Sequence, residues 1–187
     1  MTFEFNYEFI FIILLINYLY TKLYYKDDVN ISYQQLEYLI PLINDLNITK
    51  KLPNTRGYAG SPDYLYKINE FIKELNPNFI LEAGSGVSTL IAAYTLKKYG
   101  KGKIISLDHN EKYANQTKEE LKKHNLTKYA DVIYTPLKKQ KINKNLSLTW
   151  YDLSEIDFKE NIDLFIIDGP PINSKKSKLP RYPALPF

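Results

Sequence analysis

The fold of this chain is decided by one stretch, Phe79-Ile80-Leu81-Glu82-Ala83-Gly84-Ser85-Gly86-Val87-Ser88-Thr89. Its first three residues are apolar and indicate a buried parallel strand, which ends in an acid and then in two glycines one residue apart. Residues 87–99 follow with helical periodicity. The glycines permit a sharp turn and close approach of a ligand, and a helix start presents free N–H groups. This order is typical of a nucleotide-binding βαβ unit.

Composition indicates one folded globular domain. The chain has 187 residues, of which 44% are hydrophobic and 25% are charged, with a formal net charge of +4; this is enough chain for a substantial core. Lysines supply nearly all the positive charge and are best interpreted as solvated faces and loops, so nucleic acid is not the expected partner. The absence of Cys excludes disulfides and thiolate chemistry.

An apolar run over residues 9–20 dominates the N-terminus. It is short for a membrane span, which needs about 20 residues, and the acidic residues Glu4 and Glu8 before it argue against a signal peptide. Lys22 and several tyrosines flank its C-terminal side, as in an anchor whose following domain is cytoplasmic. We expect residues 1–26 to form an apolar helix. This helix either anchors the protein in the inner membrane as a transmembrane helix or packs on the domain or a second copy of a cytoplasmic protein.

Residues 27–78 are predicted to form a helical cap in front of the first strand. Residues 27–31 are a polar joint, after which Ser32 and Gln35 have the spacing of a capping box. Pro41 predicts a kink or break. A flexible turn over residues 57–60 precedes Ser61-Pro62, which has the pattern of an N-cap with proline at the first helical position. That turn either reaches a ligand or is a plain entry to the helix.

Residues 79–187 alternate between strand and helix patterns. Further strands are predicted at residues 103–108, 130–135 and 163–168, with an Asn110 cap on the helix after the second strand and a Gly100 stop on the helix before it. Such alternation predicts an α/β fold with a Rossmann-like, doubly wound parallel sheet of about four strands and N-terminal helices. The distinctive polar residues follow strand ends, where open α/β sheets bind ligands.

The glycine turn does not favour a phosphate ligand. A dinucleotide fingerprint requires a small third residue where Thr89 stands, and Thr89 disfavours close helix–strand packing and a bound pyrophosphate. No Gly-Lys-Ser/Thr follows, which excludes a P-loop. Glu82 would repel pyrophosphate but suits a cationic ligand. S-adenosylmethionine carries an amine and a sulfonium and no phosphate.

At this point the sequence resembles a known family. The glycine turn with Glu82, then Asp108, and then Asp168-Gly169-Pro170-Pro171 are similar to the motifs of class I S-adenosylmethionine-dependent methyltransferases. With Trp150-Tyr151-Asp152 and the tail motif of residues 181–186, the likeness narrows to an uncharacterised bacterial O-methyltransferase-like group. It covers residue 57 to the last residue.

The resemblance implies S-adenosyl-L-methionine as cofactor and a set of site residues. The glycine turn would hold the methionine moiety, the acid after the second strand the ribose, and the end of the third strand the adenine. Asp168 would be the catalytic residue, as a base, or else a carboxylate that caps a turn. Related enzymes place a metal on this acid with ligands from further along the chain, so we predict no metal. The implied cofactor-binding residues are Glu82, Gly84, Ser85, Gly86, Ser88, Thr89, Asp108, His109, Thr135, Pro136, Leu137, Asp168 and Gly169.

The family's sheet has seven strands, whereas this sequence supplies four. We therefore expect a C-terminally truncated form or a fragment, with a sheet edge that favours a partner such as the second copy of a homodimer. The expected activity is methyl transfer to a small-molecule or glycan acceptor; the alternative is a non-catalytic S-adenosylmethionine-binding or interaction protein. Trp150 and Tyr151 are predicted as core aromatics or as a wall of the adenine pocket. His124 is predicted as a solvated helix cap, and Arg181 and Tyr182 as neighbours of the active site.

Overall fold

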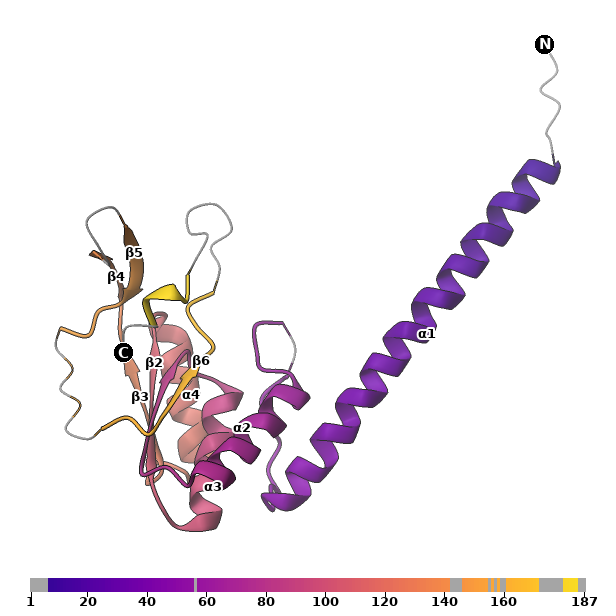
Figure 1. Ribbon diagram of the computed structural model, residues 1–187. Helices are drawn as coiled ribbons and strands as arrows, with labels where there is room; N and C mark the ends of the chain where they lie inside the picture. Colours follow the sequence, from indigo (N-terminus) through magenta and orange to yellow (C-terminus); the bar gives the residue numbers. More distant parts are fainter. Residues whose placement is uncertain are drawn as a thin grey trace.

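A four-stranded parallel sheet forms the centre of the protein, seen here in a computed structural model (Figure 1). The structure describes residues 7–55, 57–141, 146–154, 156, 158, 161–171 and 180–184, except the side chains of residues 7–10 and 23–27. The strands are β1 (Phe79–Ala83), β2 (Lys103–Asp108), β3 (Ala130–Tyr134) and β6 (Leu164–Ile167), in the order β3-β2-β1-β6. The chain moves outward from β1 to β3 and then crosses to the other side of β1. The predicted α/β, Rossmann-like parallel sheet is confirmed.

The two faces of the sheet are covered differently. Helices α2 (Pro62–Leu75), α3 (Val87–Tyr99) and α4 (Glu111–Lys123) pack on one face, against strand residues such as Ile80 and Ile104. The other face carries Leu81 and Leu107 and is covered by Trp150, Tyr151 and the tail residue Ala184. The alternation of residues 80 and 81 between these two clusters follows from the period-two geometry of a strand.

Local sequence chemistry explains the helix ends. Ser61 precedes Pro62 at the start of α2, with its hydroxyl directed to Asp63 instead of to the helix backbone. Asn110 caps α4 as predicted, because its side chain accepts a hydrogen bond from the Lys112 amide at 3.0 Å. Gly100 ends α3 with a φ of +68°, a left-handed conformation that glycine adopts without a steric cost.

The N-terminal region differs from the prediction. A single helix, α1 (Tyr7–Asp45), runs through both the predicted joint at residues 27–31 and Pro41. No glycine or proline interrupts residues 7–40, and Gln35 accepts a hydrogen bond from the Asp63 amide of α2 at 3.2 Å instead of completing a capping box. The predicted joint is therefore wrong. Within the described residues, no helix has a stretch that is long and apolar enough to cross a membrane, so the predicted transmembrane helix is not found there.

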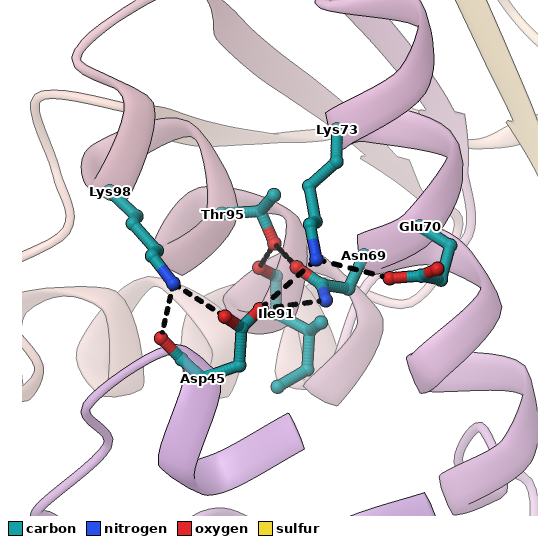
Figure 2. A network of polar contacts seen from close by, with 7 residues as sticks. All are labelled: Asp45, Asn69, Glu70, Lys73, Ile91, Thr95 and Lys98. Carbon is teal, nitrogen blue, oxygen red and sulfur yellow. Dashed lines mark hydrogen bonds and ion pairs between the residues drawn. The ribbon is translucent and has the colours of Figure 1, made fainter. Parts of the chain in front are cut away.

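A polar network attaches the C-terminal end of α1 to α2 and α3 (Figure 2). The Asp45 carboxylate accepts hydrogen bonds from Lys98 Nζ at 2.5 Å and from Asn69 Nδ2 at 3.1 Å, and lies 3.6 Å from Lys73 Nζ. The Thr95 hydroxyl donates a hydrogen bond to Asn69 Oδ1 at 3.0 Å. The Lys98 hydrogen bond is the main cause that lowers the pKa of Asp45. Beyond this end, α1 extends away from the sheet (Figure 1).

Two further features differ from the prediction. An antiparallel hairpin, β4 (Leu137–Lys141) and β5 (Ser147–Tyr151), stands between β3 and β6, where no strands were predicted. His124 follows α4 as a C-cap but is 2% exposed, not solvated, because Tyr94 Oη lies 2.7 Å from its Nδ1. The tail residues 185–186 lie outside the described residues.

Candidate functional site

The glycine turns after β1 and β6 meet at the point where the strand order of the sheet reverses. β1 and β6 are neighbours: the chain runs from β1 outward to β2 and β3 and then returns to the other side of β1, and this reversal of the strand order makes a topological switch point. Gly84 follows β1 with a φ of +105°, and a Cβ on it would stand 2.9 Å from the Gly169 nitrogen. Both positions therefore require glycine: a side chain at either one would separate the turns. Open α/β sheets bind ligands at this crevice.

Gly86 leaves open space at the start of α3. Its φ is +152°, and a Cβ built on it would have no heavy atom of the described residues within 4 Å. Its N–H donates to the Thr89 hydroxyl at 3.1 Å, which holds the first turn of the helix. A ligand can therefore approach the backbone here without meeting a side chain.

Glu82 is fully buried beneath the glycine turn. Its Oε2 accepts hydrogen bonds from the Thr89 hydroxyl at 2.6 Å and from the Ser106 hydroxyl, whereas Oε1 has no hydrogen-bond partner among the described residues. Burial raises the pKa of Glu82 to about 7, against the opposite effect of the Ser106 hydrogen bond. Thr89 is thus a bridge between α3 and the strands. The prediction that it disfavours close helix–strand packing is wrong, because its hydroxyl has polar partners there.

Asp108 ends β2 and is 5% exposed. Its Oδ2 accepts a hydrogen bond from the Ser85 hydroxyl at 2.6 Å, and its Oδ1 accepts from the Asn110 amide at 2.9 Å. His109 is partly exposed, with Nδ1 3.8 Å from the Asp108 carboxylate. The arrangement brings Ser85 of the glycine turn and the acid after β2 together, and the ribose-binding role of Asp108 stays a prediction.

Asp168 lies after β6 beside the C-terminal tail. Burial raises the pKa of its carboxyl, and the positive charge of Arg181 opposes that shift. Arg181 Nη2 donates to the main-chain oxygen of Asp168 and lies 3.8 Å from Oδ1. The short 3-10 helix η1 (Tyr182–Ala184) follows and places Ala184 against β5. The tail therefore runs beside the strand ends, as the resemblance implied (Figure 1).

The remaining predicted residues lie at the margins of this site. Thr135 is buried and its amide donates to the Asp108 main-chain oxygen at 2.7 Å. Pro136 is exposed, and Leu137 begins the hairpin. Ser88 is buried in the first turn of α3. No contact among these four residues identifies which of them would touch a ligand, so their cofactor-binding roles stay predictions.

Sequence reasoning missed one residue and left another undecided. Tyr64 of α2 is half-buried. Its pKa is raised first by burial and then by the negative charges of Asp168 and Glu82, so its hydroxyl feels the acids of the candidate site. The turn at residues 57–60 was the available signal, because Gly60 packs on the Tyr64 ring. Tyr151, which was predicted as core or pocket wall, is fully buried, and its hydroxyl has no hydrogen-bond partner in the described part of the chain.

The acids of the site do not form a metal-binding cluster among the described residues. Within the described ranges, no three His, Asp or Glu side chains are gathered so that they could hold a metal ion. The expectation that the protein uses no metal stays a prediction.

Comparison with known proteins gives the family. The sequence pattern of a methyltransferase domain matches residues 81–179, which include both glycine turns, Asp108 and Asp168. The chain belongs to this methyltransferase-domain family. A search of curated protein sequences finds no significant match.

Solved methyltransferase structures are similar to part of the domain. A Podospora anserina methyltransferase bound to S-adenosylhomocysteine is 18% identical, with 59% of this chain and 50% of that chain covered and a TM-score of 0.45. An O-methyltransferase from Bacillus cereus in complex with S-adenosylhomocysteine is 23% identical, with 54% and 43% covered and a TM-score of 0.37. The chain thus spans half or less of the length of these structures.

Proposed function

We propose that this methyltransferase domain binds S-adenosyl-L-methionine at the switch point and transfers its methyl group to a small-molecule or glycan acceptor. The observation that carries the proposal is the open space at Gly86, which lies between the Asp108 and Asp168 turns. Glu82 supports the proposal, because its buried Oε1 has no hydrogen-bond donor within the part of the chain that the structure describes, and such an acceptor suits a ligand with an amine. Glu82, Asp108 and Asp168 together favour a cationic ligand over a phosphate.

Methyl transfer depends more on how the cofactor and the acceptor are positioned than on a strong acid or base. When bound, the cofactor supplies a methyl group on a positively charged sulfur. Asp108 would hold the ribose, and Asp168 would accept the proton that an acceptor hydroxyl or amine releases. The raised pKa of Asp168 makes it a stronger base than an exposed aspartate, and the positive charge of Arg181 limits that rise.

Calorimetry with S-adenosylhomocysteine tests the binding step. We expect the unmodified protein to bind and Asp108→Asn to weaken binding at least about tenfold, because a charged hydrogen bond contributes roughly 1.5–3 kcal/mol. Gly86→Ala should also weaken binding, since its methyl group enters the open space. Asp131→Asn, an exposed change at the start of β3, is the matched control. No binding by the unmodified protein, or equal binding by Asp108→Asn, would refute the proposal.

Methyl transfer is tested separately from binding. Incubation with methyl-labelled S-adenosylmethionine and a cell extract should label an acceptor, and Asp168→Asn should reduce labelling more than binding. Binding without any transfer would favour the alternative, a non-catalytic S-adenosylmethionine-binding protein.

The apolar segment of α1, defined here as residues 11–20, is proposed to contact the inner membrane from the cytoplasmic side. Its large apolar side chains are between 45% and 67% exposed around the whole helix, and a helix that is apolar on all sides is normally buried or in lipid. They are Phe11, Ile12, Ile13, Leu14, Leu15, Ile16, Tyr18, Leu19 and Tyr20. Detergent-free fractionation should recover the protein with membranes. Full recovery in the supernatant as a dimer would instead favour packing between two copies.

A further inference from the structure

Tyr151 carries a hydroxyl that is buried at the junction of the two glycine turns. The residue ends β5 and is 0% exposed, and its Oη has no hydrogen-bond partner among the described residues. A Cβ built on Gly169 would stand 2.5 Å from this Oη and 3.1 Å from Gly84 Cα. The hydroxyl therefore lies directly over the backbone where the turns after β1 and β6 touch.

The surroundings keep this hydroxyl as a hydrogen-bond donor. Burial, and then the negative charges of Asp108, Glu82 and Asp168, raise the pKa of Tyr151 well above its ordinary value. The phenol thus keeps its proton throughout the physiological range. A buried hydroxyl without a partner destabilises a fold, so a fold retains one where something else compensates, such as a ligand.

Packing fixes the direction of the side chain. The Tyr151 ring meets Trp150 edge-on at 5.1 Å and His109 at 6.4 Å between centroids. The hairpin pairing of Tyr151 with Leu137 holds its backbone. The hydroxyl is therefore positioned before a ligand arrives, which lowers the entropy that binding must overcome.

We infer that Tyr151 is a cofactor-positioning residue whose hydroxyl donates a hydrogen bond to the carboxylate of the methionine moiety. This inference rests on the proposed function. The acids of the site are acceptors and suit the amine and the ribose hydroxyls, but a ligand carboxylate needs a donor. Tyr151 supplies one beside the glycine turn, whereas the Arg181 guanidinium is engaged by Asp168. Neither Gly84 nor Gly169 has a side chain that could cover this Oη.

The variant Tyr151→Phe tests the inference with two readouts of opposite sign. Phenylalanine keeps the ring and removes the unpaired hydroxyl, so the Tm of the ligand-free protein should be unchanged or higher. Affinity for S-adenosylhomocysteine in calorimetry should fall roughly tenfold, the equivalent of one hydrogen bond of about 1.4 kcal/mol. A purely structural tyrosine would give the reverse, a lower Tm with unchanged affinity, and that result overturns the inference. Tyr134→Phe, an exposed tyrosine at the end of β3, is the matched control and should change neither.

A second ligand identifies the group that the hydroxyl contacts. The probe 5′-methylthioadenosine keeps the adenosine and the sulfur but lacks the amino-acid carboxylate. It should bind the unmodified protein and Tyr151→Phe equally. An equal loss for both ligands would mean contact with the nucleoside and would overturn the assignment. If the unmodified protein and Tyr151→Phe bind S-adenosylhomocysteine with equal affinity, this inference alone fails. If the unmodified protein binds neither ligand, the proposed function fails.

Discussion

The two faces of the sheet are built by different rules. The helix-covered face, defined by α2, α3 and α4, is a continuous apolar core in which α2 and α4 each bury one stripe and α3 is buried on all sides from Val87 to Leu96. The hairpin-covered face, defined by β4, β5 and the tail, has a smaller core around Trp150 and Tyr151. Its covering segments are shorter, and they carry Arg181 and the Tyr151 hydroxyl to the ligand end of the strands.

This difference separates stability from function. A regular helix can fill a core with little regard to what stands at the strand ends. A hairpin and a tail instead place individual side chains over the switch point, where open sheets bind ligands. We therefore expect changes in the apolar core of the first face to act on unfolding alone, and changes on the second face to act on both unfolding and binding.

Trp150→Ala should have the largest effect. Trp150 is 1% exposed at the centre of the hairpin-covered face, and removing a buried tryptophan costs about 3–5 kcal/mol. Leu90→Ala, at 0% exposure on the helix-covered face, should cost about 2–5 kcal/mol. Both are measured by urea unfolding. If Trp150→Ala costs under about 1 kcal/mol, the hairpin is not a true half of the core and the comparison fails.

Glu82→Gln should change the pH dependence of stability by the next largest amount. The folded pKa of Glu82 is about 7 and its ordinary value is 4.5. Because the folded pKa is raised, the stability present below pH 4.5 is lost as pH rises through 7. The loss has an upper limit of about 3 kcal/mol. Glutamine cannot ionise, so the variant should become progressively more stable than the unmodified protein between pH 5 and 8.

Denaturant titrations at several pH values measure this difference. Glu119→Gln is the matched control, since its side chain is 70% exposed on α4 and its stability difference should stay constant with pH. A difference for Glu82→Gln that is equally constant would show that Glu82 ionises normally in the folded protein. The same variant should weaken S-adenosylmethionine binding if Oε1 faces the ligand amine.

The sequence predicted the helix-covered face well, since its signals are local. The 87–99 helix and the glycine stop at Gly100 follow from periodicity and cap chemistry. The site acids were found because strand ends and glycine turns are also short-range patterns. The continuous helix α1 was not predicted, because a polar stretch with a serine can start a helix or lie within one.

The hairpin-covered face was harder to predict for a physical reason. β4 reads Leu-Lys-Lys-Gln-Lys, which has no apolar alternation, and it is ordered by pairing with β5 instead of by its own pattern. The burial of His124 likewise depends on Tyr94, which is 30 residues away. Neither signal exists within one window of the sequence.

Asp45→Asn should have the smallest effect and tests how α1 is held. The carboxylate is 29% exposed and joins α1 to Lys98, Lys73 and Asn69 (Figure 2). Exposed ion pairs contribute little, so global stability should fall by about 0.5–1 kcal/mol. Amide hydrogen exchange around Leu46 and Ile48 should rise more clearly, because these residues follow the helix end and are buried by its docking.

Asp28→Asn, exposed on the distant part of α1, is the control. The pKa of Asp45 is lowered, so the stability that its carboxylate contributes is present above the ordinary pKa of 3.8 and is lost as the pH falls below that value. In acid, Asp45→Asn and Asp28→Asn should therefore be equally stable. Unchanged exchange at residues 46–48 would mean that apolar contacts of Leu42 and Leu46 hold α1 by themselves, and the helix-covered face would then need no polar attachment at all.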